Sequence, residues 1–374
     1  MRVAGIMSGT SLDGIDVAIV DIQGRRIRPL AFRSSSYPEP VRKAILGVSN
    51  ANTATAEIAR VHFLLGQLYA SAVQATCRHS RIPPDSIELV GCHGQTIYHQ
   101  GEKAAFLGRP VATTLQVGEA SLIAEQLSVP VVSDFRTRDM AAGGKGAPLV
   151  PYVDYLLFRH ATKGRVALNI GGIANVTAIP ASAQPGDVIA FDTGPGNMVI
   201  DALVSELTRG RKRFDRDGAI SAGGCLERGL LKRLLADPYY RQRPPKTAGR
   251  EQYGAAFIRR LKRGMTLKDV IATSTVLTAA TIALGVDRFI KPRMHVDEVI
   301  ASGGGVHNRT LMAYLQAFLP GIRITRTDEF GINPDAKEAV AFAILAYETW
   351  HRRPSNLPSA TGARHAVVLG KVTH

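Results

Sequence analysis

The stretch VAGIMSGTSLDGIDVAIVDI, residues 3–22, decides the fold class. It has an apolar segment over residues 3–7, a polar turn over residues 8–13 and a second apolar segment over residues 15–22. In the second segment apolar and polar residues partly alternate, which is typical of a half-buried β-strand. The stretch therefore predicts a β-hairpin with an unusually polar tip.

The same pattern returns later in the chain. Residues 166–179, VALNIGGIANVTAI, again place two apolar segments on either side of a glycine turn. Two such hairpins, about 160 residues apart, suggest a duplicated α/β unit. We expect two domains, residues 1–160 and residues 161–374, with the last helix packing back toward the first domain.

Apolar spacing predicts further elements around the two hairpins. Helices are expected over residues 55–78, 149–158, 274–289, 308–318 and 337–350, and strands over residues 87–92, 129–133, 188–191 and 298–302. Polar clusters at residues 93–96 and 134–139 follow two of these strands, where open α/β sheets bind ligands. Residues 236–253, rich in Pro, Arg and Tyr, predict a mobile loop, and the residues after 350 a polar tail.

Composition indicates an ordinary folded protein. The 374 residues are 45% hydrophobic and 21% charged, which argues against extended disorder. No stretch approaches the roughly 20 uninterrupted apolar residues of a membrane-spanning helix, and the first apolar run is too short for a signal peptide. The three cysteines show no CxxC spacing and suit reduced thiols. We therefore expect a cytoplasmic protein without a membrane partner.

The balance of 46 Lys and Arg against 31 Asp and Glu gives a net charge of +15 and raises the possibility of an anionic partner. The densest basic cluster, residues 209–216, contains a single aromatic residue, Phe214. Nucleic-acid grooves usually add stacking aromatics to their basic residues. A solvated loop is therefore favoured, and no nucleic-acid partner is expected.

Glycine-rich turns are the candidate phosphate sites, because backbone N–H groups can converge there without Cβ atoms in the way. The chain contains neither GxxxxGK[ST] nor a GxGxxG after its first strand, so P-loop and dinucleotide-binding interpretations are weak. Three turns remain, at residues 8–14, 171–172 and 303–305. Singly each is more often a tight turn, but together they favour a nucleotide. Ser8, Thr10 and Ser11 could hold phosphate oxygens, and Asp13 a hydrated magnesium ion.

Eight motifs, in the same order, resemble those of the anhydro-N-acetylmuramic acid kinase family, and the resemblance covers nearly the whole chain. They are GIMSGTSLDGID (5–16), GCHGQT (91–96), DFRTRD (134–139), GGKGAPLV (143–150), NIGGIAN (169–175), FDTGPGN (191–197), FDRDG (214–218) and SGGG (302–305). The family belongs to the actin, Hsp70 and sugar kinase superfamily. The resemblance implies an α/β fold of two duplicated actin-like, ribonuclease H-like lobes with a nucleotide cleft between them.

By this resemblance the cofactors are ATP and magnesium, and the protein is a homodimer acting on a small amino sugar. Asp13 would contact magnesium, and Gly303, Gly304 and Gly305 would lie under the adenosine. The remaining nucleotide-binding residues would be Gly9, Thr10, Ser11, Leu12, Asp13, Gly14, Ile15, Asp16, Asn169, Gly171 and Gly172.

The family's reaction, as the resemblance implies it, phosphorylates O6 of 1,6-anhydro-N-acetylmuramic acid while water opens the anhydro bridge at C1. The product is N-acetylmuramic acid 6-phosphate, an intermediate of cell-wall recycling. O6 carries no proton in this substrate, so the water needs the base, and a carboxylate suits that role. Spacing alone leaves Asp192 equally suited to cap a helix starting at Asn197. The resemblance favours Asp192 as the base, and its ordinary pKa of about 3.9 predicts an ionised side chain.

The sugar-binding candidates also carry structural alternatives. The Arg138 guanidinium could hold the lactyl carboxylate of the sugar in a forked pair, or it could pair with Asp134 or Asp139. Glu338 stands three residues after Asp335, and this spacing is typical of a capping box. The resemblance instead implies that Glu338 contacts the sugar.

His93, Gln95 and Thr96 complete the candidate sugar-binding set. They could hydrogen-bond sugar hydroxyls or the acetamido group, although a histidine beside glycine is structural as often as functional. An alternative function for the whole chain is a nucleotide-dependent binding module of the same fold without sugar chemistry. That module would be indifferent to Asp192→Asn.

Overall fold

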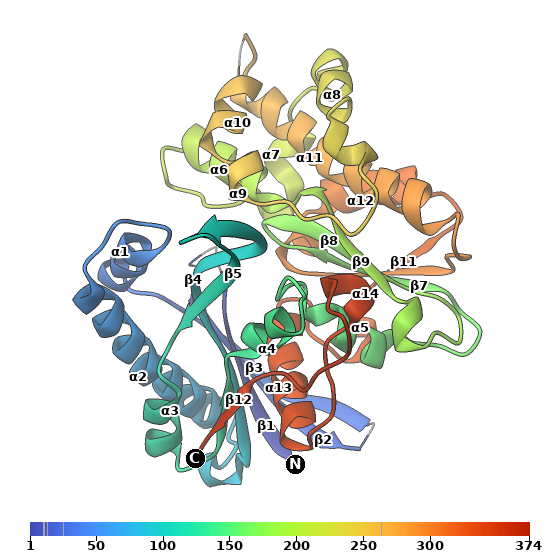
Figure 1. Ribbon diagram of the computed structural model, residues 1–374. Helices are drawn as coiled ribbons and strands as arrows, with labels where there is room; N and C mark the ends of the chain where they lie inside the picture. The colour runs from blue at the N-terminus through green and yellow to red at the C-terminus, as the bar shows by residue number, and fades with distance from the viewer. Residues whose placement is uncertain (10–11, 13, 25, 263) are drawn as a thin grey trace. The chain divides into compact units, whose positions relative to one another are not determined.

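The structure is a computed structural model that describes residues 1–9, 12, 14–24, 26–262 and 264–374, with Arg250 described by its backbone alone. The chain divides into two compact units (Figure 1). Unit 1 comprises residues 1–153 and 331–374, and unit 2 comprises residues 154–330. Each unit is built on one mixed β-sheet.

Unit 1 has its sheet in the order β12-β6-β4-β1-β2-β3, with β5 paired to β4. The strands are β1 (Arg2–Ser8), β2 (Gly14–Gln23), β3 (Arg26–Ser36), β4 (Leu89–Phe106), β5 (Arg109–Val117), β6 (Val131–Ser133) and β12 (Lys371–Thr373). The helices are α1 (Glu39–Val48), α2 (Thr55–His79), α3 (Ala120–Leu127), α4 (Phe135–Ala141), α13 (Lys337–Trp350) and α14 (Pro358–Thr361), with the short helix η1 (Pro84–Ser86) before β4. Helix α5 (Val150–Phe158) crosses the boundary between the units.

Unit 2 has its sheet in the order β11-β10-β7-β8-β9. The strands are β7 (Arg165–Ile170), β8 (Ile173–Ile179), β9 (Ile189–Pro195), β10 (Glu298–Ser302) and β11 (Arg323–Arg326). The longer helices are α6 (Asn197–Leu207), α8 (Arg228–Leu235), α10 (Ala255–Leu261), α11 (Leu267–Gly285) and α12 (Arg309–Phe318). Short helical segments are η2 (Pro185–Asp187), η3 (Arg216–Gly218), α7 (Ala219–Ala222), η4 (Pro238–Arg241), α9 (Arg250–Tyr253), η5 (Val286–Ile290), η6 (Gly304–His307) and η7 (Thr327–Phe330).

The two sheets share one strand order. In each unit the first three strands pair antiparallel in sequence, as β1-β2-β3 and as β7-β8-β9. The fourth strand, β4 or β10, then pairs parallel to the first. A later strand, β6 or β11, pairs parallel to the fourth, and in unit 1 the additional strand β5 forms an antiparallel hairpin with β4. This confirms the expected fold class of two duplicated α/β lobes.

The expected domain ranges need a correction at the C-terminus. Residues 331–374 belong to unit 1, although the sequence analysis placed them in the second domain. The reason is packing: α13 is buried along most of its length and lies against β1, β2 and β4. The first boundary falls at Val153, inside α5, rather than at residue 160.

Three local expectations also differ from the structure. Residues 93–96 lie within β4 rather than after it, because β4 continues into a hairpin with β5. The residues after 350 are no polar tail, since Ser355, Asn356 and Leu369 are buried and β12 pairs with β6. Residues 236–253 pack into unit 2 and bury Tyr239, Tyr240 and Tyr253.

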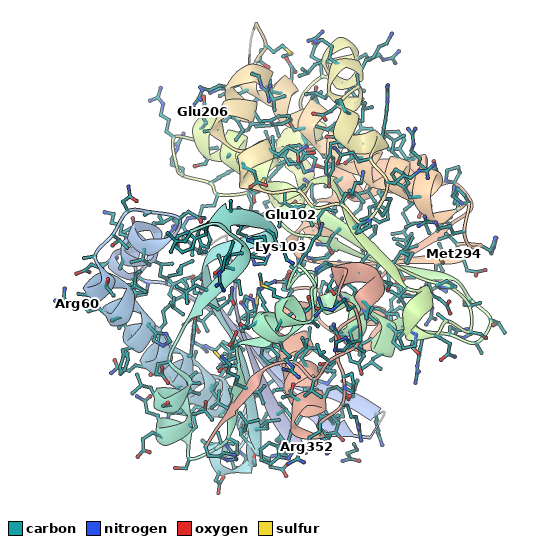
Figure 2. The ribbon with its side chains drawn as sticks, viewed as in Figure 1. Arg60, Glu102, Lys103, Glu206, Met294 and Arg352 are labelled. Atoms are coloured by element: carbon teal, nitrogen blue, oxygen red, sulfur yellow. The ribbon has the colours of Figure 1, made fainter. Side chains whose placement is uncertain are left out.

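Burial follows the apolar spacing of the helices. On α2, Val61 and Leu65 enter the core of unit 1, whereas Arg60 projects outward (Figure 2). Helix α11 with η5 is long and apolar enough to cross a membrane by composition, but 89% of its apolar window is buried inside the structure. It is the central core helix of unit 2.

Two glycines set the distance between the unit 1 sheet and α13. A Cβ on Gly5 of β1 would overlap the Ala339 carbonyl oxygen, and one on Gly91 of β4 would overlap that of Phe342. The helix backbone therefore lies directly on neighbouring strands that pair at these two positions. Only glycine leaves room for this contact.

We predict that Gly91→Ala lowers the free energy of unfolding by about 2–3 kcal/mol, because the helix must move off the sheet. Urea denaturation measures the change. Gly47→Ala in α1 is the matched control: nothing lies within 4 Å of its added Cβ, so it should leave stability unchanged or raise it. Equal stability of Gly91→Ala and the parent protein would contradict the close packing of α13.

Candidate functional site

A row of polar side chains crosses the sheet of unit 2. Ser302 on β10 pairs with Asn169 on β7. Asn169 pairs in turn with Asn175 on β8, and Asn175 with Asp192 on β9. Paired residues on adjacent strands point to the same face of a sheet. The residues one position away belong to the hydrophobic core of unit 2: Leu168, Val176 and Phe191.

Asp192 is held at the end of this row by residues 239–248, which run along the edge strand β9. The Ala248 N–H donates to Asp192 Oδ2 at 2.8 Å. The Asp192 N–H donates to the Lys246 carbonyl at 3.1 Å, and the Tyr239 hydroxyl donates to the Asp192 carbonyl at 2.7 Å. Backbone and side chain of Asp192 are thus both fixed.

The Asp192 carboxyl is not the ordinary ionised group that its sequence context suggested. Its pKa is raised to about 7, chiefly by burial and to a smaller extent by nearby Glu251. The Ala248 hydrogen bond and the Lys246 charge oppose this shift. The group therefore exchanges its proton near neutral pH, which is where a general base works best.

The structure also separates Asp192 from the helix cap. Helix α6 begins at Asn197 with Gly196 at the N-cap, and no side chain caps it. Its first amides are bonded elsewhere, since Asn197 N–H donates to the Gly171 carbonyl and Met198 N–H to the Gly172 carbonyl. Capping therefore does not explain the carboxylate at position 192.

The glycine segments of unit 2 form one cluster. The Asn197 side-chain amide donates to the Ile170 carbonyl at 3.1 Å, which ties the start of α6 to the β7–β8 turn. Gly303 has φ +81°, and a Cβ there would lie 2.6 Å from Asn169 Oδ1. The turn after β10 therefore packs on Asn169, and the structure brings together the predicted residues Asn169, Gly171, Gly172, Gly303, Gly304 and Gly305.

Internal packing does not require every glycine in this cluster. A Cβ on Gly171, Gly172 or Gly304 would meet nothing closer than 3.6 Å. Neither Gly171 nor Gly172 adopts a positive φ. Open space beside such backbone is what a phosphate group needs to approach main-chain amides.

In unit 1 the end of β1 carries a buried polar network. Ser8 Oγ donates to Gln95 Oε1 at 2.5 Å, and the Tyr37 hydroxyl lies 2.7 Å from Ser8 Oγ. Burial raises the pKa of Tyr37 to about 12, so it stays protonated and donates to Ser8. In the adjoining turn Leu12 is buried, and its N–H bonds to the Gly9 carbonyl. Of the predicted phosphate-binding residues, Thr10, Ser11 and Asp13 lie outside the described residues.

His93 and Arg136 form a second cluster in unit 1. Arg136 donates to His93 Nε2 through Nε at 3.1 Å and through Nη2 at 2.9 Å, and through Nη1 to the Gly146 carbonyl at 2.8 Å. His93 therefore carries its proton on Nδ1 and donates it to the Gly94 carbonyl. Burial, with Arg136 nearby, lowers the pKa of His93 well below its usual value, so the ring is neutral. Burial also lowers the pKa of Arg136 to about 10.

Arg138 lies on the exposed side of α4, so the structure brings Arg136 rather than Arg138 to His93. The alternative ion pairs of Arg138 are absent among the described residues. The Asp139 carboxylate accepts hydrogen bonds from Gly146 N–H, Asn356 and Thr361, and Asp134 pairs with Lys371. Asp139 is therefore a structural anchor, and the guanidinium of Arg138 is exposed.

Glu338 and Thr96 also lie in unit 1. Ala336 occupies the N-cap of α13 and no side chain caps that helix, so a capping box does not account for Glu338. The Glu338 charge acts on Arg136 and opposes the fall of its pKa. The Thr96 hydroxyl accepts a hydrogen bond from Gln116 at 3.2 Å.

Across the described part of the chain, no three His, Cys, Asp or Glu side chains are grouped as metal ligands. Magnesium usually takes only one or two protein carboxylates and completes its shell with phosphates and water, so it does not require such a group. Asp16, near the start of β2, is a described carboxylate close in sequence to the turn predicted to bind phosphate.

Comparison with known proteins decides the family. The family model "Anhydro-N-acetylmuramic acid kinase" matches residues 1–374. The chain belongs to this family. Relatives of that description are 45% identical in Caldanaerobacter subterraneus subsp. tengcongensis (99% of this chain, 96% of the relative) and 43% identical in Bacillus cereus strain G9842 (100% and 99%). The kinase is thus a phosphotransferase acting on an amino sugar.

Solved structures with distant likeness include the activator of a 2-hydroxyisocaproyl-CoA dehydratase from Clostridium difficile, at 12% identity, TM-score 0.45 and coverage of 93% of this chain and 95% of that chain. A ROK family glucokinase from Streptomyces griseus has 13% identity, TM-score 0.38 and coverage of 93% and 100%.

Sequence reasoning missed two basic residues that the structure places beside predicted site residues of the kinase, Arg136 beside His93 and Lys246 beside Asp192. Arg136 stands two positions from Arg138 in the same motif, and only the start of α4 decides which of them faces inward. Lys246 lies in a proline-rich segment that was expected to be mobile. The signal available for Lys246 was a lysine directly after two prolines and among three tyrosines, which is unusual for a solvated loop.

We predict that Asp192→Asn stabilises the kinase in alkaline solution. A carboxyl group whose pKa is higher in the folded than in the unfolded protein makes folding less favourable as the pH rises. The loss occurs between the pKa in the unfolded state, about 4, and the pKa in the folded state, about 7. The stability of the variant relative to the parent should therefore grow by about 2 kcal/mol between pH 5 and pH 8. Thermal unfolding at both pH values measures it, with the exposed Asp287→Asn as control. A pH-independent difference would refute the raised pKa.

Proposed function

We propose that the protein uses ATP and magnesium to phosphorylate O6 of 1,6-anhydro-N-acetylmuramic acid while Asp192 directs a water molecule to C1. The C1–O6 bond breaks, the water oxygen bonds to C1, and O6 bonds to the transferred phosphorus. Asp192 accepts the proton that the water loses. ATP supplies the phosphoryl group, and magnesium neutralises the charge of its phosphates.

The observation that carries this proposal is the environment of Asp192. Its side chain stands at the end of a polar row, with Oδ2 bonded to Ala248 and a pKa of about 7. Within the described residues no hydrogen-bond donor is bonded to Oδ1, so this oxygen is available to a water molecule. A fixed carboxylate with one available oxygen suits a base that must aim a water at one carbon.

The nucleotide roles follow the glycine segments. Gly303, Gly304 and Gly305 would lie under the adenosine, and Asn169, Gly171 and Gly172 would contact phosphates, where the open backbone at Gly171 and Gly172 supports an approach of phosphate oxygens. In unit 1 the turn from Gly9 to Asp16 would contact phosphates, with Asp13 at magnesium.

Arg138 is the proposed holder of the lactyl carboxylate, since its guanidinium is exposed and unbonded to carboxylates in the described residues. Thr96 and Glu338 would contact sugar hydroxyls or the acetamido group, whereas Gln95, whose side chain is already bonded to Ser8 and to the Thr96 carbonyl, would support Thr96. Both ring nitrogens of His93 are already bonded, so His93 would serve the sugar by orienting Arg136.

The wider setting is proposed with the same function. The kinase would work in the cytoplasm, in peptidoglycan recycling, as a homodimer and without nucleic-acid or membrane partners. Phe106 and Leu107 at the tip of the β4–β5 hairpin are 65% and 88% exposed, which gives unit 1 apolar surface that a second copy would cover. Glu102 and Lys103 lie on the same hairpin (Figure 2).

We predict that Asp192→Asn lowers kcat at least about 1000-fold, because an amide cannot accept the proton of water. The assay mixes protein, magnesium ATP and the anhydro sugar, and measures ADP together with the 6-phosphate sugar. Asp287→Asn should retain full activity. Near-normal turnover by Asp192→Asn would remove Asp192 as the base, whereas nucleotide binding without consumption of the sugar by the parent protein would favour a binding module without sugar chemistry.

We predict that Arg138→Ala raises the KM for the anhydro sugar about 10-fold or more and leaves the KM for ATP unchanged, because a charge-assisted pair to the lactyl group is lost. Initial rates at varied sugar and fixed ATP measure this. Arg78→Ala, at an exposed position on α2, is the control. An unchanged sugar KM would assign the carboxylate contact to another residue.

A further inference from the structure

Residues 237–248, termed here the edge segment, connect Asp192 to a lysine that the reaction itself does not use. The segment bonds to Asp192 at three points, through the Tyr239 hydroxyl, the Lys246 carbonyl and the Ala248 N–H. Only the last bond reaches the carboxylate. The position of Ala248 therefore decides how the Asp192 side chain is held.

Lys246 fastens the edge segment to itself and to the core. Its side chain is buried, with 7% of the residue exposed, and Nζ donates to the Tyr239 carbonyl at 3.0 Å. The ammonium also lies over three aromatic rings, 4.5 Å from the centroid of Tyr239, 5.0 Å from Phe289 and 5.8 Å from Phe191. No described carboxylate lies within ion-pair distance of Nζ, so the rings and one carbonyl provide its stabilisation.

A buried ammonium without a carboxylate partner is costly, so its contacts in the structure need an explanation. The Lys246 side chain links two parts of the edge segment. Its Nζ bonds to the Tyr239 carbonyl, and its backbone lies two residues before Ala248. The three rings and the Tyr239 carbonyl, termed here the lysine cage, thus close the edge segment into a loop whose two ends both bond to Asp192.

We propose that Lys246 is a positioning residue for the reaction: its caged ammonium locks the edge segment so that Ala248 N–H stays on Oδ2 and Oδ1 stays aimed at the water. This proposal rests on the proposed role of Asp192 as base. Lys246 touches no substrate in it and acts through Ala248.

The charges around Asp192 and Lys246 predict how the pH dependence of activity should change when the Lys246 ammonium is removed. Asp192 faces Lys246 and Glu251, and Lys246 faces Asp192 and Arg288 of η5. The Lys246 charge and the Ala248 hydrogen bond both favour ionised Asp192. Burial, with Arg288 nearby, lowers the pKa of Lys246 to about 8. Loss of the ammonium should therefore move the acid limb of the activity profile to higher pH.

The test compares Lys246→Met with Lys246→Arg, which keeps a cation over the rings, and with Lys163→Met, at an exposed lysine of unit 2, as control. Lys246→Met should lower kcat about 10- to 100-fold and change both KM values less than about twofold. Its acid limb should move up by about half a pH unit. Lys246→Arg should recover part of the loss.

Hydrogen exchange followed by mass spectrometry gives the readout that does not depend on chemistry. Peptides covering residues 237–248 should exchange faster in Lys246→Met than in the parent protein and the control. Unchanged kcat in Lys246→Met, or a lower kcat with unchanged exchange of the edge segment, would overturn the proposal.

A second variant guards against misfolding of Lys246→Met. Tyr239→Phe keeps the ring under the ammonium but removes the hydroxyl bond to the Asp192 carbonyl. It should lower kcat with little change in KM, and unchanged kcat would count against the edge segment as the holder of Asp192. Turnover by Asp192→Asn would instead refute the role of Asp192 as the base. Faster exchange in Lys246→Met would, even then, show that Lys246 fixes the edge segment.

Discussion

The register between β7, β8 and β9 is the constraint on which the proposed chemistry depends. Side chains alternate between the faces of a strand, so a slip of one residue would turn Asp192 into the core and Phe191 out of it. An irregularity between Ala174 and Asn175 fixes this register at the critical point. It leaves Thr193 as the extra residue on β9, and the buried Thr193 hydroxyl donates to the Ala174 carbonyl at 3.1 Å.

The same strand shows how stability is exchanged for reactivity. Asp192 is kept in surroundings that disfavour its charge, and Lys246 is buried with rings and a carbonyl in place of a carboxylate. A direct ion pair between the two would stabilise both charges, but it would lower the pKa of Asp192 and occupy an oxygen that the water needs. The edge segment avoids this by presenting a neutral amide to Oδ2.

Much of the fold was predictable because local pattern and burial agree. The hairpins at the start of each unit, α2 and α13 follow apolar spacing, and the structure gives them nearly the expected bounds. The tail and the edge segment were not predictable, since their polar residues are satisfied by distant partners. Asn356, for example, donates to Asp139, 217 positions away in the chain. In the candidate site, the glycine turns and Asp192 were identified by motif, whereas the choice between Arg136 and Arg138 depends on where α4 begins.

The duplicated strand order also explains why the site residues of the two units differ in kind. In unit 1 the residue paired across from the end of β1 is Gln95, and its side chain is committed to Ser8 and, through Ser8, to Tyr37. At the matching place in unit 2, Asn169 is paired with Ser302, whose hydroxyl instead donates to the backbone of Leu168. The unit 1 network buries its polar groups against one another, whereas unit 2 leaves Asn175 and Asp192 only partly buried. The same topology therefore yields a closed network of buried side chains at the end of β1 in one unit and, in the other, a face where a carboxylate can still meet water.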